Sequence, residues 1–479
     1  AWHAGFNQQF ASFNTFSTNL YASFLNEKWT SKTAVLYNSS KNDFSFTNTY
    51  KIPQSDEKRQ NAAYKQVHVN QLLAYRINDF QSLEAEVWFN NAERETPNSI
   101  LVNKAAAAIL TDNYLRSRLA WNYQKGNQQL QIGYAFLYEW QRFEDSTVIN
   151  IYNESLNDTN ITASHIVQLN HAIQLSRYLK WQNGLNIRFD EVSGSNRMGR
   201  QNTSGIQSGL IFSKIKLSAQ AVIRAEIWNE KVLPFSPFAS IRYEILKHVF
   251  ASFYGGYNYR IPSLNDRFWV PGGNINLKPE SGWTGEAALF YKTSRKKENT
   301  LIRLAYYRSN LVNYIQWVPG QLGIWSPHNL KEVLLSGIDF NAEYGREFSV
   351  FSVSAELNVS YNNATVLASE LKNDASIGQQ VVYQPLFKIT TGLNLGYHDW
   401  YVHGGYRYTS QVSTSYDGST KDLDSFNLVD ASISKSFRVK KLNITGVFAA
   451  NNLLNVAYET IPYYPMPLSN YSLTIKISI

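Results

Sequence analysis

The chain has 479 residues, of which 44% are hydrophobic and only 17% are charged, and its formal net charge is +8 at pH 7. Aromatic residues reach 14% and cysteine is absent, which excludes a disordered chain, a disulfide scaffold and any site built on a thiolate. The lysines and arginines are scattered along the chain, so the positive charge does not predict a nucleic-acid surface.

Apolar and polar residues alternate with a period of two from one end of the chain to the other, which predicts β-strands. The clearest stretches, in chain order, are residues 130–140, 181–190, 215–227, 351–362 and 471–479. These segments are about ten residues or longer, whereas strands of globular proteins usually have about five or six residues. About ten tilted residues are what a strand needs to cross a bilayer.

The connections between these segments alternate in length. The short ones are predicted at residues 26–27, 78–79, 125–127, 246–247, 345–347, 398–399 and 439–440. The long ones are predicted at residues 40–61, 94–111, 144–162, 259–280, 310–331, 363–383, 411–424 and 453–468. Short turns at one rim and long loops at the other are typical of outer-membrane barrels, in which the turns are periplasmic and the loops extracellular.

About 22 such segments can be counted, and lipid offers no partner for the backbone groups of an open sheet edge. We therefore predict an all-β fold, a closed 22-stranded antiparallel transmembrane β-barrel that occupies residues 1–479 as one domain. The even number of strands places both chain ends at the periplasmic rim, and the last strand has to pair with the first.

Catalytic patterns are weak throughout the chain. The segment Gly205-Ile206-Gln207-Ser208-Gly209 has its serine one place away from the position of a nucleophile elbow, and the eight histidines are dispersed. Lumen-facing charges such as Arg188 and Glu226 are better explained as a hydrated wall than as a ligand site. We therefore expect no enzyme, no catalytic residue, no metal site and no cofactor.

The long loops are better candidates for ligand recognition, because aromatic rings with an interleaved arginine suit a flat, hydrophilic ligand. The alternative is that these side chains pack within the loops or against the rim. The candidate ligand-binding residues are Arg267, Trp269, Trp317, Trp325, Tyr463 and Tyr464.

Two regions resemble a known family. Residues 259–266 (Tyr-Arg-Ile-Pro-Ser-Leu-Asn-Asp), 272–274 (Gly-Gly-Asn) and 276–280 (Asn-Leu-Lys-Pro-Glu) look like the mid-barrel signature of TonB-dependent outer-membrane receptors. Residues 451–455, Tyr458 and 465–467 resemble the end of such barrels. Residues 42–44 and 60–66 are similar to the first hairpins of Bacteroidota members, and the cobalamin and siderophore receptors are the most similar group.

The chain departs from the family pattern at three places. Leu468 and Ser469 stand where the family usually has Gly-Arg, and the chain ends in Ile479 where many such barrels end in an aromatic residue. We also expect the TonB box and the N-terminal plug, which family members carry before the barrel, to lie outside residues 1–479.

The resemblance implies a function. It implies a receptor integral to the outer membrane of a Gram-negative bacterium, which takes up cobalamin, siderophore-bound iron, haem or a similar nutrient with high affinity. The implied partners are outer-membrane lipids, a plug from the same gene or a separate chain, the TonB complex acting through that plug, and a surface lipoprotein. The alternatives are a passive pore without a plug, and a structural or assembly barrel that docks a lipoprotein or adhesin.

Overall fold

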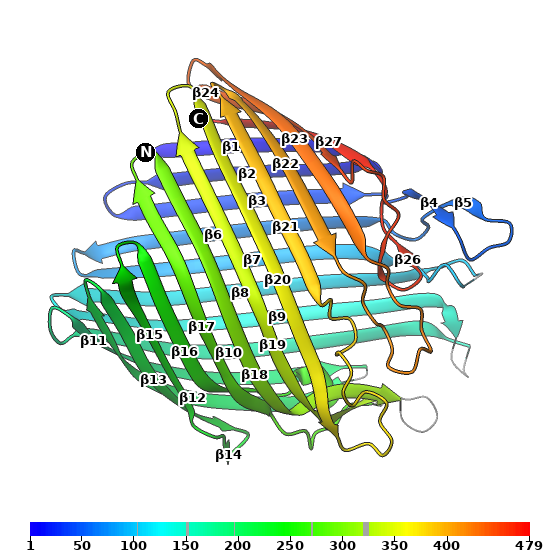
Figure 1. Cartoon of the computed structure of the whole chain (residues 1–479), viewed down its shortest axis with the longest axis horizontal. Coiled ribbons are helices and arrows are strands. Elements are labelled where there is room, and N and C mark those ends of the chain that lie inside the picture. The colour runs from blue at the N-terminus through cyan, green and yellow to red at the C-terminus, as the bar shows by residue number, and fades with distance from the viewer. Residues whose placement is uncertain (103, 150–152, 196, 270–271, 320–324) are drawn as a thin grey trace.

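The computed structural model describes residues 1–479 except 103, 150–152, 196, 270–271 and 320–324. Within the described residues, 22 long strands form the wall of a barrel (Figure 1). They are β1 (Trp2–Ala11), β2 (Thr15–Leu25), β3 (Trp29–Ser40), β6 (Tyr64–Asn78), β7 (Gln81–Thr96), β8 (Ala108–Lys125), β9 (Gln128–Ile149), β10 (Ser155–Gln174), β11 (Leu179–Gly194), β12 (Arg197–Lys214), β13 (Leu217–Trp228), β15 (Ser236–Leu246), β16 (Val249–Arg260), β17 (Glu280–Arg295), β18 (Glu298–Pro319), β19 (Trp325–Glu347), β20 (Phe351–Ser369), β21 (Phe387–Tyr397), β22 (Trp400–Thr409), β23 (Phe426–Val439), β24 (Leu442–Asn451) and β27 (Asn470–Ser478).

Five short strands and one short helix lie in the described parts of the connections between the wall strands. The two-residue strand β14 (Lys231–Val232) extends the main sheet beside β13. Two small hairpins lie in loops, one formed by β4 (Ser45–Asn48) and β5 (Ser55–Lys58), the other by β25 (Glu459–Ile461) and β26 (Tyr464–Pro465). The helix α1 (Leu264–Phe268) lies between β16 and β17.

The sheet closes on itself. Each wall strand pairs antiparallel with its neighbours, and the last strand, β27, pairs with β24 on one side and with β1 on the other. The closing register runs from Gly5 opposite Ser478 to Ala11 opposite Ser472. In the part of the chain that the structure describes, closure gives every wall strand a partner on both sides, as a hydrocarbon environment requires. The predicted closed 22-stranded antiparallel barrel is therefore confirmed.

The two faces of the wall differ as the alternation predicts. Ile206 is 61% exposed and Leu289 is 55% exposed, although both are large and apolar. On the other face, Glu226 is buried and accepts a hydrogen bond of 2.7 Å from the hydroxyl of Tyr259. Exposed aliphatic side chains around a closed sheet are what a lipid-facing surface has, while the polar side chains point into the interior, which we call the lumen.

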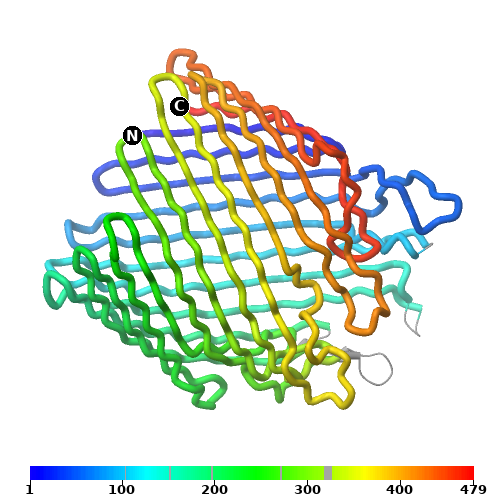
Figure 2. The backbone as a smooth tube through the Cα atoms, viewed as in Figure 1, coloured from blue at the N-terminus to red at the C-terminus, as the bar shows by residue number. Residues whose placement is uncertain are grey.

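Both chain ends lie at the same rim (Figure 2). The N-terminal ammonium of Ala1 donates to the carbonyl oxygen of Leu25 at 2.5 Å, and the amide of Ile479 donates to the carbonyl oxygen of Ala4 at 3.0 Å. The tight turns after β2, β6 and β8 lie at this end, which we call the short-turn rim. The β4–β5 hairpin and the other long connections project from the opposite end, the long-loop rim (Figure 1).

The structure corrects several predicted connections. Residues 144–162 and 310–331 are mostly strand, because β9 continues to Ile149, β10 begins at Ser155, β18 continues to Pro319 and β19 begins at Trp325. The turn predicted at 345–347 lies at 348–350, since β19 ends at Glu347. Helix α1 was not predicted. No helix in the described part of the chain is long and apolar enough to span a membrane.

Candidate functional site

Helix α1 forms because its first turn is capped on both sides. The Ser263 hydroxyl accepts a hydrogen bond of 3.1 Å from the amide of Asp266, and the Asp266 carboxylate accepts one of 2.9 Å from the amide of Ser263. This reciprocal capping box satisfies two amides that the helix itself leaves free. Pro262 lies just before the cap and is fully buried, so the chain enters the turn in a fixed direction.

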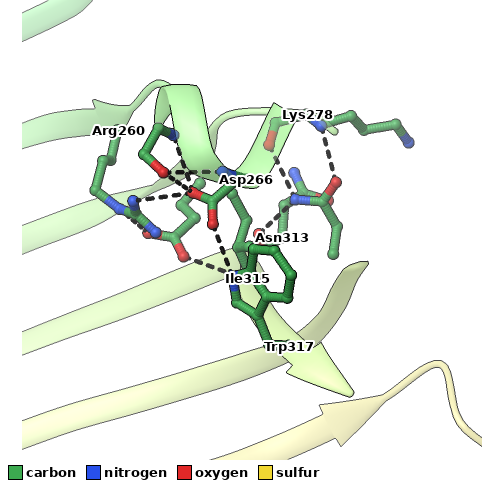
Figure 3. A network of polar contacts seen from close by, with 9 residues as sticks. Arg260, Asp266, Lys278, Asn313, Ile315 and Trp317 are labelled. Carbon is green, nitrogen blue, oxygen red and sulfur yellow. Dashed lines mark hydrogen bonds and ion pairs between the residues drawn. The ribbon is translucent and has the colours of Figure 1, made fainter. Parts of the chain in front are cut away.

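Asp266 and Glu280 fasten this loop to the ends of three strands (Figure 3). The indole nitrogen of Trp317, on β18, donates to Asp266 Oδ1 at 2.9 Å. Glu280, the first residue of β17, accepts from Arg260 Nε at 2.6 Å and from the amide of Ile315 at 2.7 Å. Because both carboxylates are buried and hydrogen-bonded to charged or backbone donors, these contacts hold residues 261–269 and 272–279 of the loop in one position.

A side-chain amide fastens the second half of the same loop. Asn329, on β19, donates to the carbonyl oxygens of Lys278 at 2.9 Å and Asn313 at 2.8 Å, and its Oδ1 accepts from the amide of Lys278 at 2.8 Å (Figure 3). Asn274 donates to the carbonyl oxygen of Pro327 at 3.1 Å. The loop between β16 and β17 is therefore attached to the neighbouring hairpin along much of its length.

Helix α1 packs against the lumen face of β12 and β13. The Arg267 guanidinium lies over the rings of Trp228, at 4.9 Å, and Phe268, at 4.6 Å, and donates to Gln201 Oε1 at 2.7 Å. Burial lowers the pKa of the Arg267 guanidinium. Gly199 lies directly against the Phe268 ring, where a Cβ atom would overlap the ring. The loop therefore folds inward, over the mouth of the lumen.

A cavity of about 580 Å³ lies beneath this inward loop. On the loop side it is lined by Ser263, Leu264 and Asn265, and on the wall side by residues of the strands β6 to β11. The charged wall residues are Arg94, Asp112, Arg116, Glu139 and Arg188, and the amide residues are Gln66, Asn90, Asn113, Gln141 and Asn160. The cavity can thus offer both donors and acceptors to a hydrophilic ligand.

The wall charges of the cavity are already paired. Arg116 contacts Glu139 at 2.7 Å, and Arg188 contacts Asp190 at 2.8 Å. Arg116 also lies over the rings of Trp88, at 5.2 Å, and Tyr114, at 4.5 Å. Because these pairs are close to neutral as a group, the cavity favours hydrogen bonding and stacking over capture of a strongly charged ligand.

Asn160, which lines the cavity, and its neighbour Asp158 each carry an acceptor without a partner among the described residues. Asp158 and Asn160 are each 5% exposed, and Asn160 donates to Asp158 Oδ2 at 3.3 Å. Asp158 Oδ1 and Asn160 Oδ1 accept no hydrogen bond from the described residues. A buried acceptor without a donor costs about 1–3 kcal/mol, so this pair is a favourable place for an N–H or O–H group to bind.

A second set of contacts ties two loops to β19 at the long-loop rim. The ammonium of Lys331 donates to Ser376 Oγ at 2.7 Å, lies 3.5 Å from Asp374 and sits 4.4 Å from the ring centroid of Tyr416. Burial alone would raise the pKa of the Asp374 carboxyl, but hydrogen bonds from Ser369 and Ser376 and the charge of Lys331 lower it to about 2. We call these contacts the Lys331 clasp.

Comparison with known proteins places this geometry in a family. A family model described as "TonB dependent receptor-like, beta-barrel" matches residues 2–453. The chain belongs to the TonB-dependent receptor-like β-barrel family. The resemblance inferred from residues 259–280 is thereby confirmed.

The receptor barrel is similar to curated transporters over part of their length. It is 26% identical over 242 residues to the vitamin B12 transporter BtuB of Photobacterium profundum, which covers 48% of this chain and 36% of that protein. It is 25% identical over 288 residues to BtuB of Vibrio cholerae, covering 55% of this chain and 42% of that protein. The match thus spans well under half of the length of these relatives.

Solved structures share the fold at low identity. The copper transporter OprC superposes with a TM-score of 0.79 at 11% identity, and the FrpB iron transporter of Neisseria meningitidis with a TM-score of 0.78 at 12% identity. In both cases all of this chain is covered, together with 80% and 81% of the respective relative. At this identity the similarity establishes the fold of the receptor barrel and nothing finer.

The predicted ligand residues fall in two separate places. Arg267, Trp269 and Trp317 belong to the inward loop or contact it, and the side chain of Trp325 lies outside the described residues. Tyr463 and Tyr464 lie in the last loop. The ring of Tyr463 is 5.2 Å from that of Tyr50, and the ring of Tyr464 is 5.2 Å from the Arg59 guanidinium. Ligand binding by these six residues stays a prediction.

The cavity residues of the receptor barrel were not singled out from the sequence. Alternation identifies Arg94, Arg116 and Glu139 as lumen-facing, but it assigns the same property to every second residue of every strand. Which of these residues lie beneath the inward loop depends on the path of residues 261–279, and the capping signature at Ser263 and Asp266 was the available signal for the helix in that path.

Proposed function

We propose that this barrel takes part in TonB-dependent uptake of a scarce nutrient across the outer membrane of a Gram-negative bacterium. The observation that carries the proposal is the inward loop with α1, held by Asp266 and Glu280 over a polar cavity at the mouth of the lumen. A loop fixed in this way presents a preformed surface to a ligand that arrives from outside, at little cost in loop ordering.

The ligand class that fits best is a hydrophilic molecule with many hydrogen-bonding groups, such as cobalamin or a siderophore complex of iron. The relatives are named as transporters of vitamin B12, iron and copper, which supports a nutrient of this kind. In the cavity, paired charges and aromatic faces would contact the ligand, and Asp158 and Asn160 would accept hydrogen bonds from its donors. No covalent step is involved, so we assign no catalytic residue.

The proposed partners follow from the family. A plug, from the same gene or from a separate chain, would occupy the lumen and contact its polar wall, and the TonB complex would act on that plug. Lipids of the outer membrane would surround the apolar outer face. A surface lipoprotein over the long-loop rim is a further partner to look for.

Growth of a strain that lacks the encoding gene tests the proposal. We expect slower growth on limiting cobalamin, haem, siderophore-bound iron or glycans, with growth restored by the intact gene. Unchanged growth on all four nutrients would contradict the proposal. Planar-bilayer recordings of the complete receptor separate it from a passive pore, since a pore without a plug would show a large, steady conductance.

Copurification distinguishes the remaining alternative. If the barrel serves only as a docking or assembly platform, it would copurify with a lipoprotein or adhesin and its deletion would leave nutrient uptake intact.

A further inference from the structure

A second cavity, of about 720 Å³, lies away from the lumen mouth, between the β4–β5 hairpin and the 97–107 loop. Among the residues that line it, four carry a positive charge, namely Lys51, Lys58, Arg59 and Lys104, and one, Glu57, carries a negative charge. The lining therefore has an excess of positive charge, unlike the paired charges of the mouth cavity.

Arg59 is the most unusual member of this lining. It is only 8% exposed, and among the described residues no carboxylate forms an ion pair with its guanidinium. The guanidinium lies over the ring of Tyr464, 5.2 Å from its centroid. Burial lowers the pKa of the Arg59 guanidinium. A buried arginine normally has an anionic partner, since the desolvation cost of an unpaired ion is several kcal/mol.

The other cations around the cavity are only partly neutralised. Lys51 contacts Glu57 at 2.6 Å, while Lys58 is 3.9 Å from Asp43 with an exposed side chain. Lys104 donates to the carbonyl oxygen of Thr147 at 2.8 Å, which satisfies a hydrogen bond and leaves its charge in place. Arg59, Lys58 and Lys104 thus remain available to an anion.

The cavity is held in shape by distant segments of the chain. Tyr50, which also lines it, accepts a hydrogen bond of 2.9 Å from Lys421 and packs edge-on against Tyr463. The amide of Ile100 donates to the carbonyl oxygen of Tyr463 at 3.1 Å. The connections between β3 and β6, β7 and β8, β22 and β23, and β24 and β27 therefore hold one preformed pocket together. The lining of this pocket is positively charged.

We propose that this pocket binds an anionic group, a phosphate or a polycarboxylate, through Arg59 with help from Lys58 and Lys104. A guanidinium presents paired N–H donors that match two oxygens of such a group. The anion could belong to a dissolved molecule or to the phosphorylated headgroup of an outer-leaflet lipid. The site goes beyond the proposed function, because it can bind an anion whether or not the barrel transports it.

Binding of inorganic pyrophosphate to the purified full-length receptor in detergent tests the proposal. Titration calorimetry at constant ionic strength should show one saturable site per chain. The affinity should fall at least tenfold in R59Q and severalfold in the double variant K58Q/K104Q, whose side chains are less buried. The matched control is K297Q, an exposed lysine in the turn between β17 and β18 at the short-turn rim, and its affinity should equal that of the wild type.

A second experiment places the wild-type receptor and R59Q in vesicles with and without lipopolysaccharide and measures how much lipopolysaccharide each protein retains. Arg59-dependent binding of pyrophosphate alone identifies a dissolved anion as the ligand, and Arg59-dependent retention of lipopolysaccharide identifies the lipid headgroup. If neither probe binds saturably, or if K58Q/K104Q and a folded R59Q both bind like the wild type, the proposal is wrong. The assay needs neither TonB nor uptake, so its failure is distinct from failure of the proposed function.

Discussion

The indole N–H of Trp317 donates to the carboxylate of Asp266 at 2.9 Å, joining the tip of β18 to the one-turn helix that covers the lumen mouth. The same carboxylate caps the helix through Ser263, so one buried group fixes both the fold of the turn and its position.

Replacing Trp317 with phenylalanine should loosen the inward loop. The change keeps an aromatic ring but removes the donor, and an acceptor that loses its partner costs about 1–3 kcal/mol. Hydrogen exchange of the amides of residues 263–269 and 272–274 should therefore be faster in W317F. The matched control is W283F, since Trp283 is exposed on the outer wall. Equal exchange in W317F and wild type would show that this hydrogen bond does not hold the loop.

Replacing Gly199 with valine should push α1 away from β12. A Cβ atom at this position overlaps the Phe268 ring, so the ring and its helix have to move. Because the chain has no cysteine, N265C gives a single thiol whose labelling by a maleimide reports exposure of the loop. Labelling should be faster in G199V, and the additional change F268A should restore the slower rate by making room. If labelling is the same in all three variants, Gly199 does not position the helix.

Acid should open the Lys331 clasp. The pKa of Asp374 is about 2 in the folded chain against 3.8 for a free side chain, so the hydrogen bonds from Ser369 and Ser376 and the charge of Lys331 together stabilise the loops above pH 4, and this contribution is lost as the pH falls through 2. The full contribution is about 2 kcal/mol. Cleavage by pepsin within residues 370–386 should rise between pH 4 and pH 2 in the wild type relative to D374N at each pH. A constant ratio of the two rates over this range would contradict the assignment.

An arginine on the outer wall should destabilise the barrel far more than one in the lumen. Leu304 is 50% exposed on the outer face, and L304R should cost about 2–4 kcal/mol of folding free energy in lipid vesicles. Gln168 lies at a similar depth but lines a cavity on the lumen side, so Q168R should have a small effect. Urea titrations of folding into vesicles measure both. Similar costs for the two variants would contradict the assignment of the faces.

The barrel itself could be predicted from the sequence because the alternation that identifies each strand lies within a few consecutive residues. Alternation such as that of Tyr471, Leu473 and Ile475 reports the lipid-facing side directly, and closure follows from the lack of backbone partners in lipid. The limits of the strands were less predictable. Near Glu144 and Trp317 the strands continue into segments predicted as loops, to Ile149 and Pro319.

The sites could be predicted only in part. The loop that carries Arg267 was identified, but its inward packing on Trp228 depends on two segments about 40 residues apart in sequence. The contact of Arg59 with Tyr464 joins the connection between β3 and β6 to the one between β24 and β27, which closure of β27 onto β1 brings together. No periodicity or spacing along the chain encodes such a contact, so the sequence could not indicate which of the candidate loop residues lie close together.

The most direct test of the central claim is uptake of labelled nutrient by cells that express the complete gene with and without a functional TonB complex. The nutrient is the one whose limitation slows growth of the deletion strain. The account predicts saturable uptake that requires both the gene and TonB. Equal, non-saturable entry in cells with and without TonB would contradict it.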